Sequence, residues 1–127
     1  MDRTIKIDDK DVKFRATART PRLYRALIGR DMIRDMNQLR VAYNKAAQLP
    51  EDASDEERAE ASLTMVDLEI FENAAYIMAR HANPDIKEKT PDEWLDSFGM
   101  FSIYEVLPKL LKLWNLNTAT TSTPKKK

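Results

Sequence analysis

One stretch in the middle of the chain is apolar on most of its sides. Residues 63–78, with the sequence LTMVDLEIFENAAYIM, place apolar side chains around more than half the circumference of a helix. Such a helix must be buried on several sides, so other elements have to pack around it. We therefore expect a central core helix that begins at a capping box of Ser54 and Glu57 and ends near Arg80 or His81.

A β-hairpin is predicted at the N-terminus. Apolar residues occupy every second position in two short runs, Ile5 and Ile7, then Val12, Phe14 and Ala16. The polar residues 8–11 between the runs are typical of a turn, so the pattern predicts a hairpin over 4–17 with one apolar face. Because an isolated hairpin is only marginally stable, helices must cover that face.

Two helices should follow the hairpin. The first is expected to begin with Thr20 as N-cap and Pro21 at the first helical position, and to end at Gly29. The second is expected over 31–48, where apolar residues recur at spacings of three and four: Met32, Met36, Leu39, Tyr43 and Ala46. That narrow seam favours lengthwise packing on another helix.

The C-terminal part should contain shorter helices. Thr90 and Glu93 form a capping box, and Gly99 is expected to end that helix. Another helix should begin after Ser102, and it should either kink at Pro108 or be replaced there by a new helix.

The sequence therefore predicts a mainly α fold with an N-terminal β-hairpin (α+β). We expect a single compact helical domain over 1–116, made of the hairpin and about five helices, and a flexible, disordered C-terminal tail over 117–127.

The chain lacks the side chains from which most active sites are built. It has no cysteine, its only glycines are Gly29 and Gly99, and His81 is its only histidine. These absences exclude thiolate chemistry, a glycine-rich phosphate loop and a histidine cluster. The carboxylates of Asp67, Glu69 and Glu72 are expected to form a solvated edge of the core helix. We expect neither an enzyme nor a bound cofactor or metal.

The N-terminus resembles no secretory signal, and no window approaches the ~18 consecutive apolar residues that a membrane helix needs. We therefore expect a cytoplasmic protein with no membrane partner.

The zero net charge hides an uneven distribution. Residues 1–49 hold twelve Lys and Arg against six Asp and Glu, whereas residues 50–124 hold six against fifteen. The simpler interpretation is that the two halves compensate each other within the fold. The alternative is that one copy attracts a second copy end to face.

Two groups of side chains are candidates for binding a partner. The first is a set of arginines, Arg22, Arg25, Arg30 and Arg34. These arginines fit contacts to carboxylates better than contacts to nucleic acid. Aromatic residues that could stack on bases are scarce nearby, and the acidic residues Asp31 and Asp35 interrupt the run of arginines. The second is the set of C-terminal aromatics Trp94, Phe98, Phe101, Tyr104 and Trp114. These aromatics are either ordinary core or, in part, a groove or self-association surface.

The order of these features resembles the tail assembly chaperones of long-tailed, siphovirus-type bacteriophages and of prophages in Gram-positive bacteria. After the hairpin come TPRLYR at 20–25 and GRD at 29–31, and later LEIFENAAYIMA at 68–79, EWLD at 93–96 and FSIYEVLP at 101–108. The resemblance covers most of residues 4–120.

The resemblance implies a non-catalytic assembly factor in the host bacterial cytoplasm, absent from the mature virion. It would bind the phage tape measure protein, keep it soluble during tail assembly and associate with further copies of itself. A longer form, made by ribosomal frameshifting, would recruit the tail tube protein, and this chain would be the short form. The codons of Lys125, Lys126 and Lys127 either form the slippery site or encode a solubilising tail. The alternative function is a helical, nucleic-acid-associated regulatory protein that uses the arginine-rich face.

Overall fold

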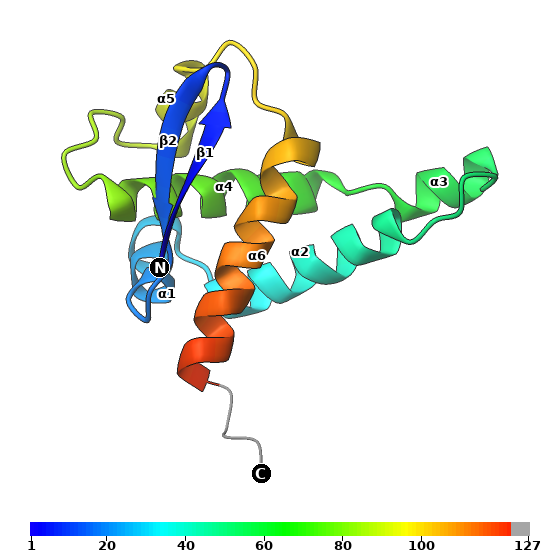
Figure 1. Ribbon diagram of the computed structural model, residues 1–127, viewed down its shortest axis with the longest axis horizontal. Helices are drawn as coiled ribbons and strands as arrows, with labels where there is room; N and C mark the ends of the chain where they lie inside the picture. The colour runs from blue at the N-terminus through cyan, green and yellow to red at the C-terminus, as the bar shows by residue number, and fades with distance from the viewer. Residues whose placement is uncertain (123–127) are drawn as a thin grey trace.

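The computed structural model describes the backbone of residues 1–122 and the side chains of residues 1–115. Over this part of the chain a two-stranded hairpin precedes six helices, which confirms the predicted mainly α fold with an N-terminal hairpin. The elements are β1 (Asp2–Ile7), β2 (Lys10–Arg15), α1 (Thr20–Ile28), α2 (Met32–Ala47), α3 (Asp55–Ala61), α4 (Met65–Ala82), α5 (Pro91–Asp96) and α6 (Ile103–Ser122) (Figure 1). Helix α6 thus continues past residue 116, where we expected the domain to end. The rest of the predicted tail, 123–127, lies outside the described residues.

The hairpin turn is shorter than predicted. Asp8 and Asp9 alone connect the strands, with φ angles of 53° and 65°, while Lys10 pairs with Ile7 and belongs to β2. A two-residue turn with both φ angles positive matches the twist of the flanking strands, which explains why the ladder extends so far. The apolar face is as expected, since Ile5, Ile7 and Phe14 are buried.

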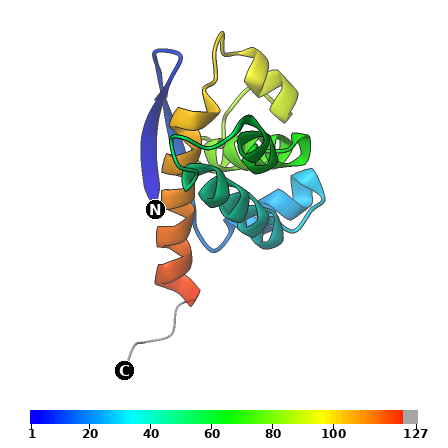
Figure 2. The same ribbon diagram turned by 90° about the vertical axis from the view of Figure 1, so that its right-hand side faces the viewer.

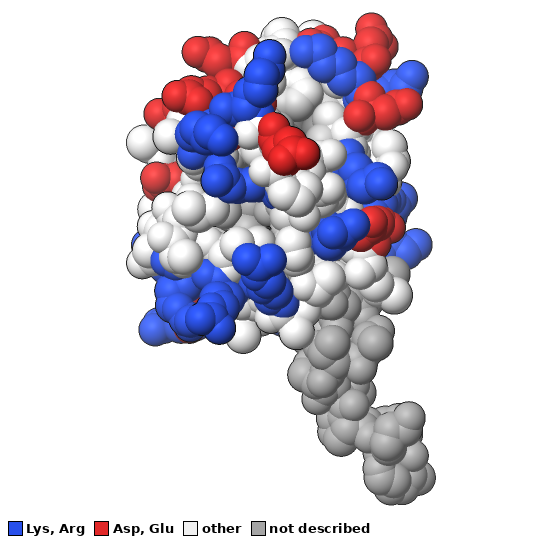
Figure 3. Space-filling model, turned by 90° about the vertical axis from the view of Figure 1, so that its left-hand side faces the viewer, with Lys and Arg blue, Asp and Glu red and all other residues white. Residues whose placement is uncertain are grey.

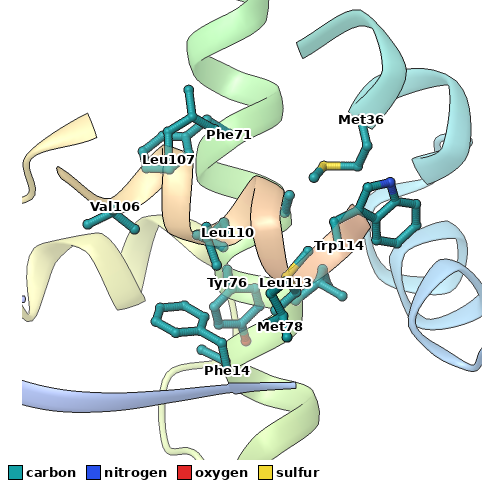
Figure 4. Packing of buried hydrophobic residues seen from close by; sticks show 14 of the residues in the cluster. Phe14, Met36, Phe71, Tyr76, Met78, Val106, Leu107, Leu110, Leu113 and Trp114 are labelled. Carbon is teal, nitrogen blue, oxygen red and sulfur yellow. The ribbon is translucent and has the colours of Figure 1, made fainter. Parts of the chain in front are cut away.

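Helix α4 is the centre of the molecule. It contacts β2, α1, α2, α5 and α6. The hairpin and α6 lie side by side on one side of α4, and α1 and α2 lie on another (Figures 1 and 2). Figure 4 shows Leu107, Leu110 and Leu113 of α6 packed towards α4, with Trp114 beside Met36 of α2. The predicted core helix therefore organises the core, in which the hairpin takes part.

The predicted helix from Ser54 to His81 is wrong in one respect, because it is two helices. Ser54 and Glu57 form the expected capping box, but it begins only the seven-residue α3. A second capping box begins α4, in which Thr64 Oγ1 accepts from the Asp67 backbone N–H at 3.0 Å and Asp67 Oδ2 accepts from the Thr64 N–H at 2.9 Å. This reciprocal pair satisfies the free N–H groups of a new helix end and stabilises the break at 62–64.

The start of α1 also differs from the prediction. Arg19 is the N-cap, and Thr20 lies within the first turn, where its buried hydroxyl accepts from the Thr17 N–H at 2.8 Å. The other end is as predicted, since Gly29 adopts a left-handed φ of 83° and its N–H bonds to the carbonyl of Arg25. Asp31 then caps α2 by accepting from the N–H groups of Ile33 and Arg34.

Near the C-terminus, α5 ends at Asp96, before Gly99. Gly99 lies instead in the loop to α6, and its N–H donates to the side chain of Asp8. Helix α6 passes through Pro108 as one continuous helix, so no new helix begins there. The carbonyl that Pro108 leaves without its usual donor belongs to Tyr104, in the first turn of α6.

Candidate partner-binding surface

The four candidate arginines lie near the α1–α2 corner. Arg22 and Arg25 are exposed on α1, Arg30 precedes α2, and Arg34 is exposed in the first turn of α2. Figure 3 shows the face at the α1 end of the molecule, where a group of Lys and Arg lies at the lower left with few carboxylates beside it, while cations and carboxylates are mixed over the upper half. The stacking aromatics that single-stranded nucleic acid requires are missing here, because Tyr24 is buried and Tyr43 lies at the other end of α2.

Arg30 has a structural partner that the sequence pattern did not reveal. Its guanidinium donates two hydrogen bonds to the buried carboxylate of Asp35, at 2.7 and 2.8 Å, and the Tyr24 hydroxyl donates a third at 2.8 Å. The hydrogen bonds from Arg30 are the main cause of the lowered pKa of Asp35, and burial is the main cause of the raised pKa of Tyr24. The Tyr24–Asp35 hydrogen bond joins α1 to α2, and Arg30 neutralises the buried carboxylate, so Arg22, Arg25 and Arg34 are the members of the predicted set that form no ion pair among the described side chains.

Three of the predicted aromatics, Trp94, Phe98 and Phe101, belong to one cluster of rings around Trp94. The Trp94 ring contacts Phe14 of the hairpin and Tyr76 of α4, with centroids 6.3 and 5.9 Å apart, and it meets Phe98 and Phe101 at 5.1 and 5.5 Å. Phe101 also stacks on Phe98 and on Phe71 of α4. Edge-to-face and stacked contacts of this kind fix ring orientation beyond what area burial alone gives.

The hairpin tip holds the loop that carries these rings. Lys10 Nζ donates to the carbonyl of Ser97 at 2.7 Å and lies 5.3 Å from the centre of the Phe98 ring. Asp8 Oδ2 accepts from the Gly99 N–H at 2.7 Å, and a Cβ on Gly99 would lie 3.3 Å from that oxygen. A larger residue at position 99 would therefore require the Asp8 carboxylate to shift by a few tenths of an ångström. Two charged side chains that sequence reasoning assigned only to a turn thus position the loop.

Burial divides the aromatic candidates into two groups. Trp94 and Trp114 are 3% and 8% exposed, so both belong to the core and neither offers a contact surface in this structure. Phe98 and Phe101 are half-buried, whereas Tyr104 is 70% exposed. Between them Met100, which the predicted set omitted, is 71% exposed. We call Phe98, Met100, Phe101 and Tyr104 the aromatic corner.

The aromatic corner combines a fixed base with exposed apolar groups. The two phenyl rings are held by the Trp94 cluster and the hairpin tip, and the side chains of Met100 and Tyr104 extend from this base into solvent. Methionine adapts to irregular apolar surfaces, and tyrosine offers an apolar ring with a polar end. Such a surface can bind an apolar segment of another protein.

The carboxylates on α4 do not form the predicted solvated edge. Asp67 is buried in its capping box and also accepts from Gln38 of α2 at 3.0 Å. Glu69 is exposed, while Glu72 is half-buried and its pKa is raised by burial and by the nearby charges of Glu69 and Asp92. These groups differ in surroundings because α4 is covered by α2 near its start and by α5 further on.

His81 lies at the end of α4 and closes a contact to α1. Its Nδ1 is 3.1 Å from Thr20 Oγ1, and burial, with the charges of Arg15 and Arg19, lowers its pKa. Among the residues with described side chains, no three His, Asp or Glu are grouped as metal ligands would be.

Comparisons with models of protein families, with curated proteins and with solved structures find no match for this chain. No helix in the described part of the chain is both long and apolar enough to cross a membrane.

Proposed function

We propose that this protein is a phage tail assembly chaperone, which binds the tape measure protein through the aromatic corner and keeps it soluble during tail assembly. The observation that carries the proposal is the exposure of Met100 and Tyr104, at 71% and 70%, on a base fixed by packed aromatic rings. The order of sequence features along residues 4–120, which resembles that family, supports the same proposal. No catalytic step is part of it.

The physical basis is the burial of apolar surface on both partners. A tape measure protein, which the family resemblance implies to be long, helical and prone to aggregate, exposes apolar side chains before assembly. Covering them with Met100 and Tyr104 removes apolar area from water on both sides. Because the rings of the base are already ordered, the conformational entropy lost on binding is limited to the exposed side chains of Met100 and Tyr104.

In this proposal the protein binds the tape measure protein in the host bacterial cytoplasm and is released before the virion is complete. Several copies would associate with each other along one tape measure protein, since many weak contacts on a long client add in avidity. Recruitment of the tail tube protein belongs, in this proposal, to the frameshifted extension.

Co-expression with the tape measure protein of the same phage tests the proposal. We expect the wild-type chain to hold that protein in the soluble fraction and to co-purify with it. Tyr104→Asp should weaken binding at least about tenfold, because an exposed aromatic anchor is replaced by a charge. The fold should tolerate the change, since an acid in the first turn of a helix is favourable.

Ile33→Asp is the matched control. Ile33 is 62% exposed and lies in the first turn of α2, as Tyr104 lies in the first turn of α6. This variant should bind the tape measure protein as the wild type does. A tape measure protein that stays insoluble beside the wild-type chain, or equal losses in both variants, would refute the proposal.

A further inference from the structure

A groove lies between α2 and α6 on the surface of the molecule. Its volume is about 560 Å³, and its lining includes the apolar groups Tyr43, Pro108 and Leu111 and the cations Arg40 and Lys112. None of the described residues that line the groove carries a carboxylate. Among the residues whose side chains are described, Arg40 and Lys112 form no ion pair. An apolar floor with uncompensated cations suits an occupant that is apolar at its tip and acidic around it.

Such a segment is present on the same chain. Residues 51–66, which we call the acidic arm, contain the linker, α3 and the start of α4, and they project from the body at one end of the longest axis (Figure 1). The arm carries six exposed carboxylates: Glu51, Asp52, Asp55, Glu56, Glu57 and Glu60. Its one cation, Arg58, donates to the backbone carbonyls of Glu51 and Ala53.

Apolar side chains lie at the corner of the arm where α3 meets α4. Met65 is 86% exposed and Val66 is 50% exposed. Of the side chains described, Met65 is thus among the apolar groups with most to gain from burial in an apolar groove. It also has the flexibility to fit one.

Among the side chains that the structure describes, no ion pair links the two halves of the chain. The two found among the described side chains, Arg15 with Asp2 and Arg30 with Asp35, both lie within the basic first half. Charge compensation between the two halves is therefore not made through any ion pair among these side chains. The acidic arm and the groove cations remain available to another molecule.

We propose that the acidic arm of one copy docks in the α2–α6 groove of a second copy, with Met65 on the apolar floor and the arm carboxylates facing Arg40 and Lys112. The inference rests on the self-association included in the proposed function and names its two surfaces. Each copy carries one arm and one groove, so the contact can repeat from copy to copy. Since charges dominate its rim, association should weaken as salt is added.

Sedimentation of the purified chain, without any client, tests the proposal by charge reversal. At low salt and concentrations up to about 200 µM the wild type should show a mass above that of the monomer. The groove variant Arg40→Glu/Lys112→Glu and the arm variant Glu56→Lys/Glu60→Lys should each raise the dissociation constant at least about tenfold, because like charges then face each other. Glu57 is left unchanged because it completes the capping box of α3.

A mixture of the two variants is the decisive sample. Each should be monomeric alone, and an equimolar mixture should associate again, since the unchanged arm of the groove variant can dock in the unchanged groove of the arm variant. The matched control, Arg22→Glu/Arg25→Glu, changes the net charge by the same amount on α1 and should leave association unchanged. Circular dichroism confirms that every variant is folded.

Three outcomes would overturn the inference: a wild type that is monomeric throughout, a mixture that does not associate, or dissociation caused equally by the α1 control. None of them depends on the tape measure protein. If the chain still self-associates but does not bind the tape measure protein, the docking of arm in groove is supported and only the proposed client is refuted.

Discussion

The carboxylate of Asp35 shows how a charged residue is accommodated inside this fold. Asp35 is 4% exposed, yet three hydrogen bonds, two from Arg30 and one from Tyr24, satisfy its oxygens. It also lies in the first turn of α2, where the helix dipole favours negative charge. A buried charge with these partners holds α1 and α2 in one arrangement.

Asp35→Asn should lower the free energy of unfolding at pH 7 by roughly 1–3 kcal/mol, because it replaces charge-assisted hydrogen bonds by neutral ones. In the wild type the pKa of Asp35 is lowered by Arg30. Its contribution is therefore complete above the unfolded pKa of about 3.9 and is lost as the pH falls through the lower, folded pKa.

Urea unfolding at pH 7 and near pH 3 measures this effect. The difference between wild type and variant should shrink on acidification, while Glu56→Gln, on the exposed arm, should change stability by less than about 0.5 kcal/mol at either pH. A difference that grows as the pH falls would contradict the assignment of the pKa shift to Asp35.

At the level of single residues, the sequence shows which side chains are available but not which other side chains they contact. Tyr104 and Trp94 belong to the same aromatic set in the sequence, but one is exposed and the other buried. Their separation depends on Phe14 and Tyr76, which reach Trp94 from elements far away in the chain. Likewise Arg30 was grouped with surface arginines, because nothing in the local pattern shows that Asp35 is buried.

At the scale of elements, the hairpin turn invites a stabilising substitution. Asp9 has a φ of 65°, a conformation that costs most residues energy and glycine none. Asp9→Gly should therefore raise the free energy of unfolding, by up to about 1 kcal/mol, once the larger entropy of an unfolded glycine is subtracted. Thermal unfolding followed by circular dichroism measures the change.

Asp11→Gly serves as the control for that prediction. Asp11 lies in β2 opposite Lys6, where a glycine only weakens the strand. This variant should be less stable than the wild type. Equal destabilisation by both substitutions would show that the turn does not gain from a residue tolerant of positive φ.

Only some helix boundaries followed from the sequence, since the predicted N-cap Thr20 and the predicted helix end at Gly99 were wrong. Gly29 ends α1 and Asp31 caps α2 as capping rules predict. The break before α4 was missed although Thr64 and Asp67 form a readable capping box, because the apolar run from Leu63 onward favoured one continuous helix. The capping box at Thr64 indicates a new helix, whereas the apolar run that includes the same residues indicates a continuous one. The structure has the new helix.

At the scale of the whole molecule, the central position of α4 was predictable, but the surfaces were not. A helix that is apolar on most of its sides has to be covered on those sides, whatever the topology. The α2–α6 groove depends on how Tyr43 and Leu111, almost seventy positions apart, meet across two helices. The aromatic corner depends similarly on Asp8 and Lys10 reaching the loop at 97–99. Such contacts leave no periodic trace in a sequence.

Hydrogen–deuterium exchange, on the chain alone and in complex with the tape measure protein, tests most directly whether the aromatic corner binds the client. The complex should slow amide exchange across residues 97–104, because the client covers the corner, and should leave α1 unchanged. Protection of α1 around Arg22 and Arg25, with no change at 97–104 in a complex that still co-purifies, would contradict the proposed role of the corner.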